Sequence, residues 1–576
     1  MSGLQTKTSS SRKPNQRPET EVFSLYNSGH YALVIEKAES LLLEHPNNVN
    51  LLNLLGAASM KLNKLSMAIK AFKKITQLKP QNPAGFNNCG NALFEDQQYD
   101  EAVKYFERAI KISDIYAPGY DGLGQAYNKL GKNSHAVKAA SRAVSLQPDN
   151  PTFICNLAAI KKENGQICEA ISTYETALQR APDDHRVLND MACTLHEAGH
   201  LDKALELQRK AVAKAPSSAP LQFNLANILN DKADTDSALK AYHTTLTLNP
   251  DAYQVYLNMS AAYLKQQNFS EGFKHYEWRW WLPDSGKMGL ESSISAWSGQ
   301  KGKKILVWGE QGVGDTILFS SMMPQLIDAS DEVIFRCDQR LIPLFSRSFK
   351  GNVRFVAKND TVYESDCDFQ IPIGSLAKFF RQSINDFSKS KNRFLSADEE
   401  RSLKIRKALV KDEKKKVFGI AWRGGASKEG EHKNKNLPLL DILKMFEKSE
   451  VIFLNLQYGN VDEDIDEAAT LGINMVNFEE IDNFADIDGV AAQINACDAI
   501  ITADGINAHL AGALGKNAYI LLPYTSDWRW GTVSDRSYWH ASLKLIRQTK
   551  PGCWEAPFAE LEKALSENHL FTRRQD

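Results

Sequence analysis

The sequence lacks an excess of charge of either sign and any long apolar run. Its 576 residues include 69 Lys and Arg against 70 Asp and Glu, a formal net charge of −1. Without a basic excess the chain has no general electrostatic attraction to nucleic acid, and we expect no nucleic-acid partner. No segment approaches the roughly 18 consecutive apolar residues of a membrane span. The N-terminus has no apolar signal-peptide core, so neither a leader nor a transmembrane segment is expected.

Paired cysteine motifs are also missing, although the chain has eight cysteines. None forms a Cys-x-x-Cys motif, and none has a histidine at the spacing of a zinc finger. We therefore expect reduced thiols, a cytoplasmic location and no metal site. The 33 Gly and 20 Pro are too few for a low-complexity chain, which excludes disorder over the whole length.

A pattern repeated every 34 residues fills the first half of the chain. Its unit boundaries fall at Pro46, Pro80, Asp114, Pro148, Pro182, Pro216 and Pro250, with Pro283 one residue early. Each unit has a small residue in its expected first helix (Gly56, Gly90, Gly124, Ala158, Ala192, Ala226) and an alanine in its second (Ala68, Ala102, Ala136, Ala170, Ala204, Ala238). Aromatic residues often follow that alanine by four positions (Phe72, Phe106, Tyr174, Tyr242). The period predicts stacked helix pairs that pack closely at the small residues.

This pattern resembles the tetratricopeptide repeat, with about eight copies over residues 15–283 after a disordered tail at 1–14. The resemblance implies a superhelix whose concave groove binds a protein or peptide. The alternative is a spacer or dimerisation arm. The last repeat runs into an aromatic cluster, Tyr276, Trp278, Trp280 and Trp281, which we expect to pack against the next domain across a linker at 284–302.

The second half alternates short apolar runs with helical patterns. Strands are expected at 303–308, 332–337, 353–356, 367–371, 416–422, 451–456, 473–477, 498–502 and 517–522, and helices at 315–328, 438–448, 483–496 and 506–514. This alternation predicts parallel sheets covered on both faces. The polar segment 383–415 divides the region into two doubly wound, Rossmann-like halves, 303–395 and 416–550, which face a cleft and are followed by a C-terminal helix and tail at 551–576.

The motif WGEQGVGDTILFSSMMP at 308–324 follows one expected strand and opens a helix. Gly312 and Gly314 allow a tight turn at the strand's carboxyl end, where open α/β sheets bind ligands. Asp315 lies at the mouth of the helix, either as its N-cap or as a reactive carboxylate. The spacing matches neither a dinucleotide-binding fingerprint nor a Walker loop.

A second motif, ITADGINAHLAGALGKNAYILLPY at 501–524, again reads as strand, turn, helix and strand. We expect Asp504 to cap a helix whose first amides, at Gly505 and Ile506, bind a diphosphate. His509, on the first turns of that helix, can reach the same ligand. The alternative for His509 is a structural role between helix and sheet.

Two further segments supply cations and aromatic rings. AWRGG at 421–425 ends a strand, so Arg423 beside Trp422 can neutralise a leaving phosphate, with Lys433 and Lys435 as helpers or merely solvated charges. DWRW at 527–530 offers Trp528 as a cover for a base or as a packing residue. The acidic run at 462–466 is expected to begin a solvated helix.

Together these segments, with NLQYG at 455–459, resemble the heptosyltransferase-like glycosyltransferases of the two-domain GT-B fold, in the bacterial subgroup with tetratricopeptide repeats in front. The resemblance implies acceptor binding by the half at 303–395 and nucleotide-sugar binding by the half at 416–550, with no obligatory metal and no resident cofactor. Asp315 corresponds to the general base. The donor site implied comprises Trp422, Arg423, Gln457, Asp504, Gly505, Ile506, His509 and Trp528. Whether the nucleotide is of the UDP or ADP type stays open.

Two other functions remain open from the sequence. One is a non-catalytic scaffold with a degenerate sugar-nucleotide domain, which is compatible with Gly505 standing where the family usually has Thr or Ser. The other is a different nucleotide-dependent α/β enzyme.

Overall fold

The computed structural model describes residues 18–282, 289–388, 392–410, 415–424, 436–447, 449–532 and 534–571. The expected tail at 1–14 lies outside the described residues. So do Gly425 of the AWRGG segment and the two lysines proposed to help Arg423, which are Lys433 and Lys435. The chain divides into two compact units, Met1–Ala215 and Pro216–Asp576. The last repeats therefore group with the sheets, not with the earlier repeats.

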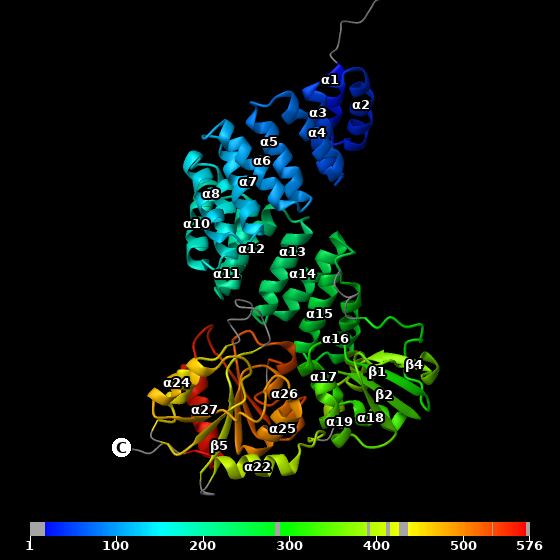
Figure 1. Ribbon diagram of the computed structural model, residues 1–576, viewed down its shortest axis with the longest axis vertical. Coiled ribbons are helices and arrows are strands. Elements are labelled where there is room, and N and C mark those ends of the chain that lie inside the picture. The colour runs from blue at the N-terminus through cyan, green and yellow to red at the C-terminus, as the bar shows by residue number, and fades with distance from the viewer. Residues whose placement is uncertain are drawn as a thin grey trace, which may run out of the picture. The chain divides into compact units, whose positions relative to one another are not determined.

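Sixteen helices precede the first sheet in the described residues (Figure 1). The first unit holds α1 (Pro18–Asn27), α2 (Tyr31–Glu44), α3 (Val49–Lys61), α4 (Leu65–Leu78), α5 (Pro83–Glu95), α6 (Tyr99–Ile112), α7 (Ala117–Lys129), α8 (Asn133–Leu146), α9 (Pro151–Glu163), α10 (Ile167–Arg180), α11 (His185–Glu197) and α12 (Leu201–Lys214). The second unit begins with α13 (Ala219–Asp231), α14 (Thr235–Leu248), α15 (Tyr253–Lys265) and α16 (Phe269–Tyr276), followed by the 3₁₀ turn η1 (Glu277–Trp281).

The 34-residue period is confirmed in the packing of these helices. A Cβ on Gly56 would lie 2.5 Å from the ring of Phe72, and one on Gly90 would lie 2.7 Å from the ring of Phe106. The small residues therefore let the aromatic stripe of the second helix touch the backbone of the first. The turn inside each of the eight described pairs places one residue at positive φ, namely Gly29, Asn63, Gln97, Gly131, Gly165, Gly199, Ala233 and Gln267.

Two parallel sheets follow in the second unit. The first has the order β3-β2-β1-β4 and contains β1 (Lys304–Trp308), β2 (Glu332–Cys337), β3 (Val353–Ala357) and β4 (Phe369–Pro372). The second has the order β10-β9-β8-β5-β6-β7 and contains β5 (Val417–Ala421), β6 (Ile452–Asn455), β7 (Asn474–Val476), β8 (Ala499–Thr502), β9 (Ala518–Leu522) and β10 (Leu543–Arg547). All nine expected strands are confirmed within two residues, whereas the edge strand β10 was not predicted.

The helices around these sheets are α17 (Val313–Ser320), α18 (Met323–Ala329), α19 (Ile342–Ser348), α20 (Ala377–Phe380), α21 (Ile384–Phe387), α22 (Glu399–Leu409), α23 (Leu439–Lys444), α24 (Asp462–Thr470), α25 (Ile487–Ala496), α26 (Ile506–Ala513) and α27 (Glu555–Glu567). The prediction of one helix over 315–328 is wrong. Pro324 stands in the first turn of α18, because proline cannot continue a preceding helix.

Two segments expected to be connectors belong to the packed structure. The amide of Trp297 donates to the carbonyl of Gln370 in β4, so the end of the expected linker forms an edge of the first sheet. The polar segment 383–415 carries α21 and α22, and Ile405 of α22 is buried. No helix in the described ranges combines the length and apolar character needed to cross a membrane. All eight cysteines are described and are free thiols.

Both sheets have a topological switch point, where the chain leaves adjacent strands in opposite directions. In the first sheet it lies at β1 and β4, and α17 follows β1. In the second it lies between β5 and β8; Arg423 follows β5 and α26 follows β8. Ligands of open α/β sheets bind at the carboxyl ends of strands at such points.

Candidate functional site

The starts of α17 and α26 meet in the second unit, although they come from different sheets. The two helices pack side by side (Figure 1). A Cβ on Gly314 would lie 3.5 Å from Cδ2 of His509 and 3.7 Å from the Cα of Ile506. The N-cap residues are Gly312 and Gly505, and neither carries a side chain that could cover the first amides. Two positive helix ends thus converge.

A cavity of about 500 Å³ lies at this meeting point. It is lined by Gln311, Gly312, Val313, Gly314, Asp338, Arg340, Arg423, Tyr458, Asn483, Phe484, Ile487, Thr502, Gly505, Ile506 and Asn507. Five of the predicted site residues line it, namely Gly312, Gly314, Arg423, Gly505 and Ile506. Its volume suits a ligand the size of a nucleotide, since small-molecule pockets span roughly 300–1,000 Å³.

Arg423 is held at the cavity from two directions. Its backbone N–H donates to Oε1 of Gln457 at 2.8 Å, and its guanidinium donates to the carbonyl of Asn460 at 2.9 Å and to the carboxylate of Asp464. Gln457 is buried and does not line the cavity, so it positions Arg423. Asp464 lies in the first turn of α24, which confirms the acidic run as a helix start.

An aromatic and cationic wall bridges the two sheets. Arg340 follows β2 of the first sheet, and its Nη1 donates to the carbonyl of Phe484 from the second half at 2.9 Å. The guanidinium lies 4.8 Å from the centroid of the Phe484 ring, and Asp338 binds its other edge. The Tyr458 ring lies 5.8 Å from that of Phe484, which is 56 % exposed. This wall offers flat apolar faces to a planar ligand. None of these residues was predicted as part of the site.

Asp315 occupies a different position from the one expected. The N-cap of α17 is Gly312, so the prediction of Asp315 as a helix cap is wrong. Its Oδ1 accepts a 2.5 Å hydrogen bond from Nη2 of Arg529, and its Oδ2 lies 3.8 Å from the site of a Cβ on Gly312. Asp315 therefore lies beside the cavity wall as half of an ion pair. Asp504 immediately precedes Gly505, which is the N-cap of α26, so the prediction of Asp504 as that cap is wrong as well.

His509 lies behind the cavity wall and is 4 % exposed. Its ring stacks on Trp530 with centroids 5.1 Å apart and an angle of 8° between the planes. Burial, with a smaller contribution from Arg529, lowers the pKa of His509 to about 3. Its Nδ1 has no hydrogen-bond partner within the described part of the chain. The residue is thus neutral and packed between helix and sheet, and it does not line the cavity.

Two predicted aromatic residues also lie away from the cavity. Trp422 is buried in the apolar core of the second sheet with Phe418 and Leu437. Trp528 is buried against the last repeat, 6.0 Å from the rings of Phe273 and Tyr276. Across the described ranges, no group of three His, Cys, Asp or Glu side chains is arranged to hold a metal.

The expected packing of the aromatic cluster against the next domain is confirmed for Tyr276 and Trp280, whose rings lie 6.1 Å from that of Phe319 and 5.4 Å from that of Trp308. Trp278 and Trp281 instead pack back on Tyr253 of the last repeat, and Trp281 is 64 % exposed.

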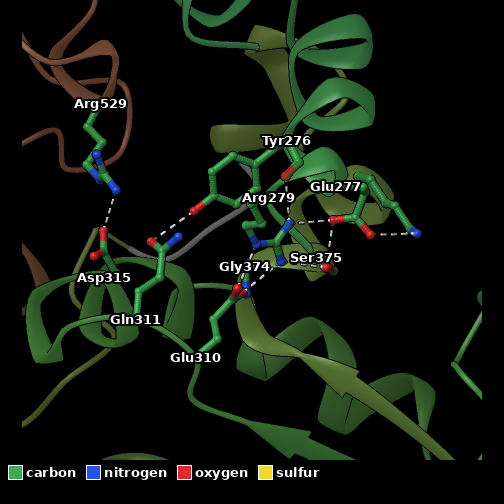
Figure 2. A network of polar contacts seen from close by, with 10 residues as sticks. Tyr276, Glu277, Arg279, Glu310, Gln311, Asp315, Gly374, Ser375 and Arg529 are labelled. Carbon is green, nitrogen blue, oxygen red and sulfur yellow. Dashed lines mark hydrogen bonds and ion pairs between the residues drawn. The ribbon is translucent and has the colours of Figure 1, made fainter. Parts of the chain in front are cut away.

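A polar network runs through the seam at Tyr276 and Trp280 (Figure 2). The guanidinium of Arg279 in η1 binds both carboxylate oxygens of Glu310 at 2.6 and 2.9 Å, and both side chains are only 2 % exposed. Burial opposes the charge of Arg279, but Glu310 outweighs this and the pKa of Arg279 is raised. Tyr276 donates to Oε1 of Gln311 at 3.0 Å. The GEQGVGDT motif thus joins the last repeat to the cavity.

Known proteins resemble parts of this chain. A family of tetratricopeptide repeats, described as the cilia and flagella-associated protein 70 C-terminal domain, matches residues 24–254. Protein FlbA of Caulobacter vibrioides is 29 % identical over 314 residues, which cover 51 % of this chain and 52 % of that protein. The chain therefore spans about half the length of this curated relative.

Solved structures resemble parts of the chain as well. A chain of the APC/C hetero-tetramer Cut9-Hcn1 has 16 % identity and a TM-score of 0.36, covering 46 % of this chain and 52 % of that one. TTC0263, a tetratricopeptide protein of Thermus thermophilus, has 24 % identity and a TM-score of 0.29, covering 31 % of this chain and 97 % of that one. The family match and the 34-residue helix pairs identify the N-terminal half of the chain as a tetratricopeptide repeat array of the protein-interaction type.

Proposed function

We propose that the second unit is a glycosyltransferase of the GT-B kind, which takes a sugar from a nucleotide-sugar donor bound in the cavity between the two sheets. The observation that carries the proposal is the convergence of two glycine-capped helix starts in one cavity with Arg340 and Arg423. Uncovered amides and guanidinium groups favour a diphosphate and stabilise a departing nucleoside diphosphate. They supply this positive potential without requiring a metal.

The aromatic wall supports a nucleotide as the ligand. A base can stack against Phe484 or Tyr458, which flank the cavity, whereas the predicted cover, Trp528, is buried in the seam. The wall does not distinguish a uracil from an adenine ring. Both UDP and ADP therefore need to be tested for binding.

The acceptor is a protein or glycan that the repeat array recruits, as the array's protein-interaction type suggests. A notch of about 140 Å³ in the first unit, lined by Thr152, Asn156, Arg186 and Asp190 among others, is suited to one side chain of such a partner.

The reaction removes a proton from an acceptor hydroxyl, for which Asp315 is the candidate base. The eight free thiols support a cytoplasmic location.

Calorimetry of the full-length chain with UDP, ADP, GDP and their common sugar conjugates tests the donor site. We expect one nucleotide to bind and Arg423→Gln to weaken it at least tenfold, because a charge-assisted contact to phosphate is lost. Arg354→Gln is the matched control, since Arg354 is a half-exposed arginine paired with Glu332 and Asp366 on the first sheet. No binding by any nucleotide, or equal losses in both variants, would contradict the proposed site.

A non-catalytic scaffold is the second candidate, and the Asp315–Arg529 ion pair favours it. One carboxylate oxygen of Asp315 is already engaged by Arg529 and is not free to accept a proton from an acceptor hydroxyl. In the scaffold, nucleotide sugars bind without turnover, and partner capture by the repeats is the only activity.

A further inference from the structure

The last repeat reaches the cavity through one hydrogen bond. The hydroxyl of Tyr276, at the end of α16, donates to Oε1 of Gln311 at 3.0 Å (Figure 2). Gln311 lines the cavity immediately before the glycine turn that opens α17. A hydrogen bond between two side chains therefore links the last repeat directly to the cavity lining.

Tyr276 is held rigidly, so it can act as a fixed reference for Gln311. Its ring is 4 % exposed, and the guanidinium of Arg279 lies 4.3 Å from the ring centroid. The rings of Phe319 and Trp528 pack against it at 6.1 and 6.0 Å. Burial raises the pKa of Tyr276, which keeps its hydroxyl protonated and able to donate.

The direction of this hydrogen bond determines what the glutamine offers to the cavity. A carboxamide has one accepting oxygen and one donating NH₂ group. Because Tyr276 engages the oxygen, the NH₂ becomes the end of the amide that can bind a ligand oxygen. Without the tyrosine hydroxyl the amide can turn over and present an acceptor instead.

We propose that Tyr276 is a positioning residue for the cavity and that it fixes Gln311 as a hydrogen-bond donor to a phosphate or hydroxyl oxygen of the ligand. The ligand class rests on the proposed function, but the positioning of Gln311 and of the segment 309–316 around it does not. The last repeat is then part of the binding site and not only an arm that recruits a partner.

The test compares Tyr276→Phe with Tyr242→Phe in the full-length chain. Tyr242 is the matched control, because it is also a buried repeat tyrosine whose hydroxyl donates to a side-chain amide oxygen, that of Asn227 at 2.8 Å. Each substitution removes one such hydrogen bond and leaves the ring in place, so the two variants should lose similar amounts of stability.

With the nucleotide that binds the wild type, whether UDP or ADP, we expect Tyr276→Phe to lose about five- to tenfold in affinity, the effect of one hydrogen bond. Tyr242→Phe should retain wild-type affinity. Gln311→Ala should lose as much as Tyr276→Phe, and the double variant should lose no more, because both changes remove the same oriented donor. Additive losses, or an unchanged affinity in Tyr276→Phe, would overturn the proposal.

Hydrogen exchange separates this proposal from the proposed function. If no nucleotide binds the wild type, the proposed function fails, and the exchange of the amides at 309–316 decides the positioning claim. Faster exchange there in Tyr276→Phe, with no change in Tyr242→Phe, would support it. Equal exchange in the two variants would refute it.

Discussion

Arg529 binds Asp315 across 214 residues of sequence, with Nη2 of the arginine 2.5 Å from Oδ1 of the carboxylate. The pair joins the first turn of α17 to the η7 turn (Trp528–Trp530), and thus one sheet domain to the other. Asp527 also binds the guanidinium, at 2.8 Å, and the Trp528 ring centroid lies 4.6 Å from it. Burial opposes this charge, but Asp315 and Asp527 outweigh it and raise the pKa of Arg529. Asp315 therefore has a structural partner whatever its chemical role.

Asp315→Asn separates the structural role from the catalytic one. The variant weakens the ion pair, so we expect it to lose about 1–2 kcal/mol of stability, less than a fully buried pair would because Asp527 remains. If Asp315 is the base of the proposed transfer, turnover should also fall about 10²- to 10⁴-fold. Arg529→Gln is the control, since it breaks the same pair and leaves the carboxylate. Equal turnover in the two variants would assign Asp315 to structure alone.

The seam at Arg279 and Glu310 predicts where the chain can be cut. A fragment of residues 216–576 retains α13–α16 and should fold and bind the same nucleotide as the full chain, because it is one compact unit. A fragment of residues 290–576 loses Tyr276 and Arg279 and leaves the Glu310 carboxylate without its cation. Loss of one partner of a buried pair costs about 3–5 kcal/mol. Thermal unfolding of both fragments checks this, and equal melting temperatures would contradict it.

His509 predicts a loss of stability in acid. Its folded-state pKa of about 3 lies below its ordinary value of 6.5, so the unfolded chain binds the proton more readily. The contribution of His509 is complete above pH 6.5 and is lost as the pH falls toward 3. The loss amounts to about 2 kcal/mol between pH 6.5 and 5, at 1.36 kcal/mol per unit. His509→Phe should reduce the pH dependence of the denaturation midpoint over this window without abolishing it, because burial also lowers the pKa of His540. Replacement of the exposed His30 by Gln is the surface control.

Ala233 stands in the turn between α13 and α14 with φ of 61°, a backbone region that favours glycine. Gly131, Gly165 and Gly199 occupy the same position in earlier repeats. We therefore expect Ala233→Gly to stabilise the protein by about 0.5–1 kcal/mol, after the greater entropy of glycine in the unfolded chain is deducted. Gly165→Ala should destabilise by a similar amount. Urea denaturation of both variants measures this, and a loss of stability in Ala233→Gly would contradict the explanation.

The sequence was sufficient for features that depend on local pattern. The 34-residue period predicts the helix pairs because each pair packs its small residue, such as Gly90, against the next helix, here at the ring of Phe106. The strands were predicted because buried parallel strands are continuous apolar runs, as in β9. The glycines at 312, 314 and 505 were assigned to the site because tight turns follow strands at the carboxyl edge of a sheet. The edge strand β10 was missed because its apolar run is interrupted by charged Lys544.

Only the tertiary structure decided which of these residues share the cavity. Trp422 and Arg423 are adjacent in sequence, yet Trp422 enters the core and Arg423 the cavity, because successive side chains at a strand end point to opposite faces. Asp315 has its partner 214 residues away, and Arg340 meets Phe484 across 144 residues. No local pattern encodes such pairs. They arise because the packing of α17 against α26 and of α16 against the first sheet brings distant side chains together, and burial then makes each charge require a partner.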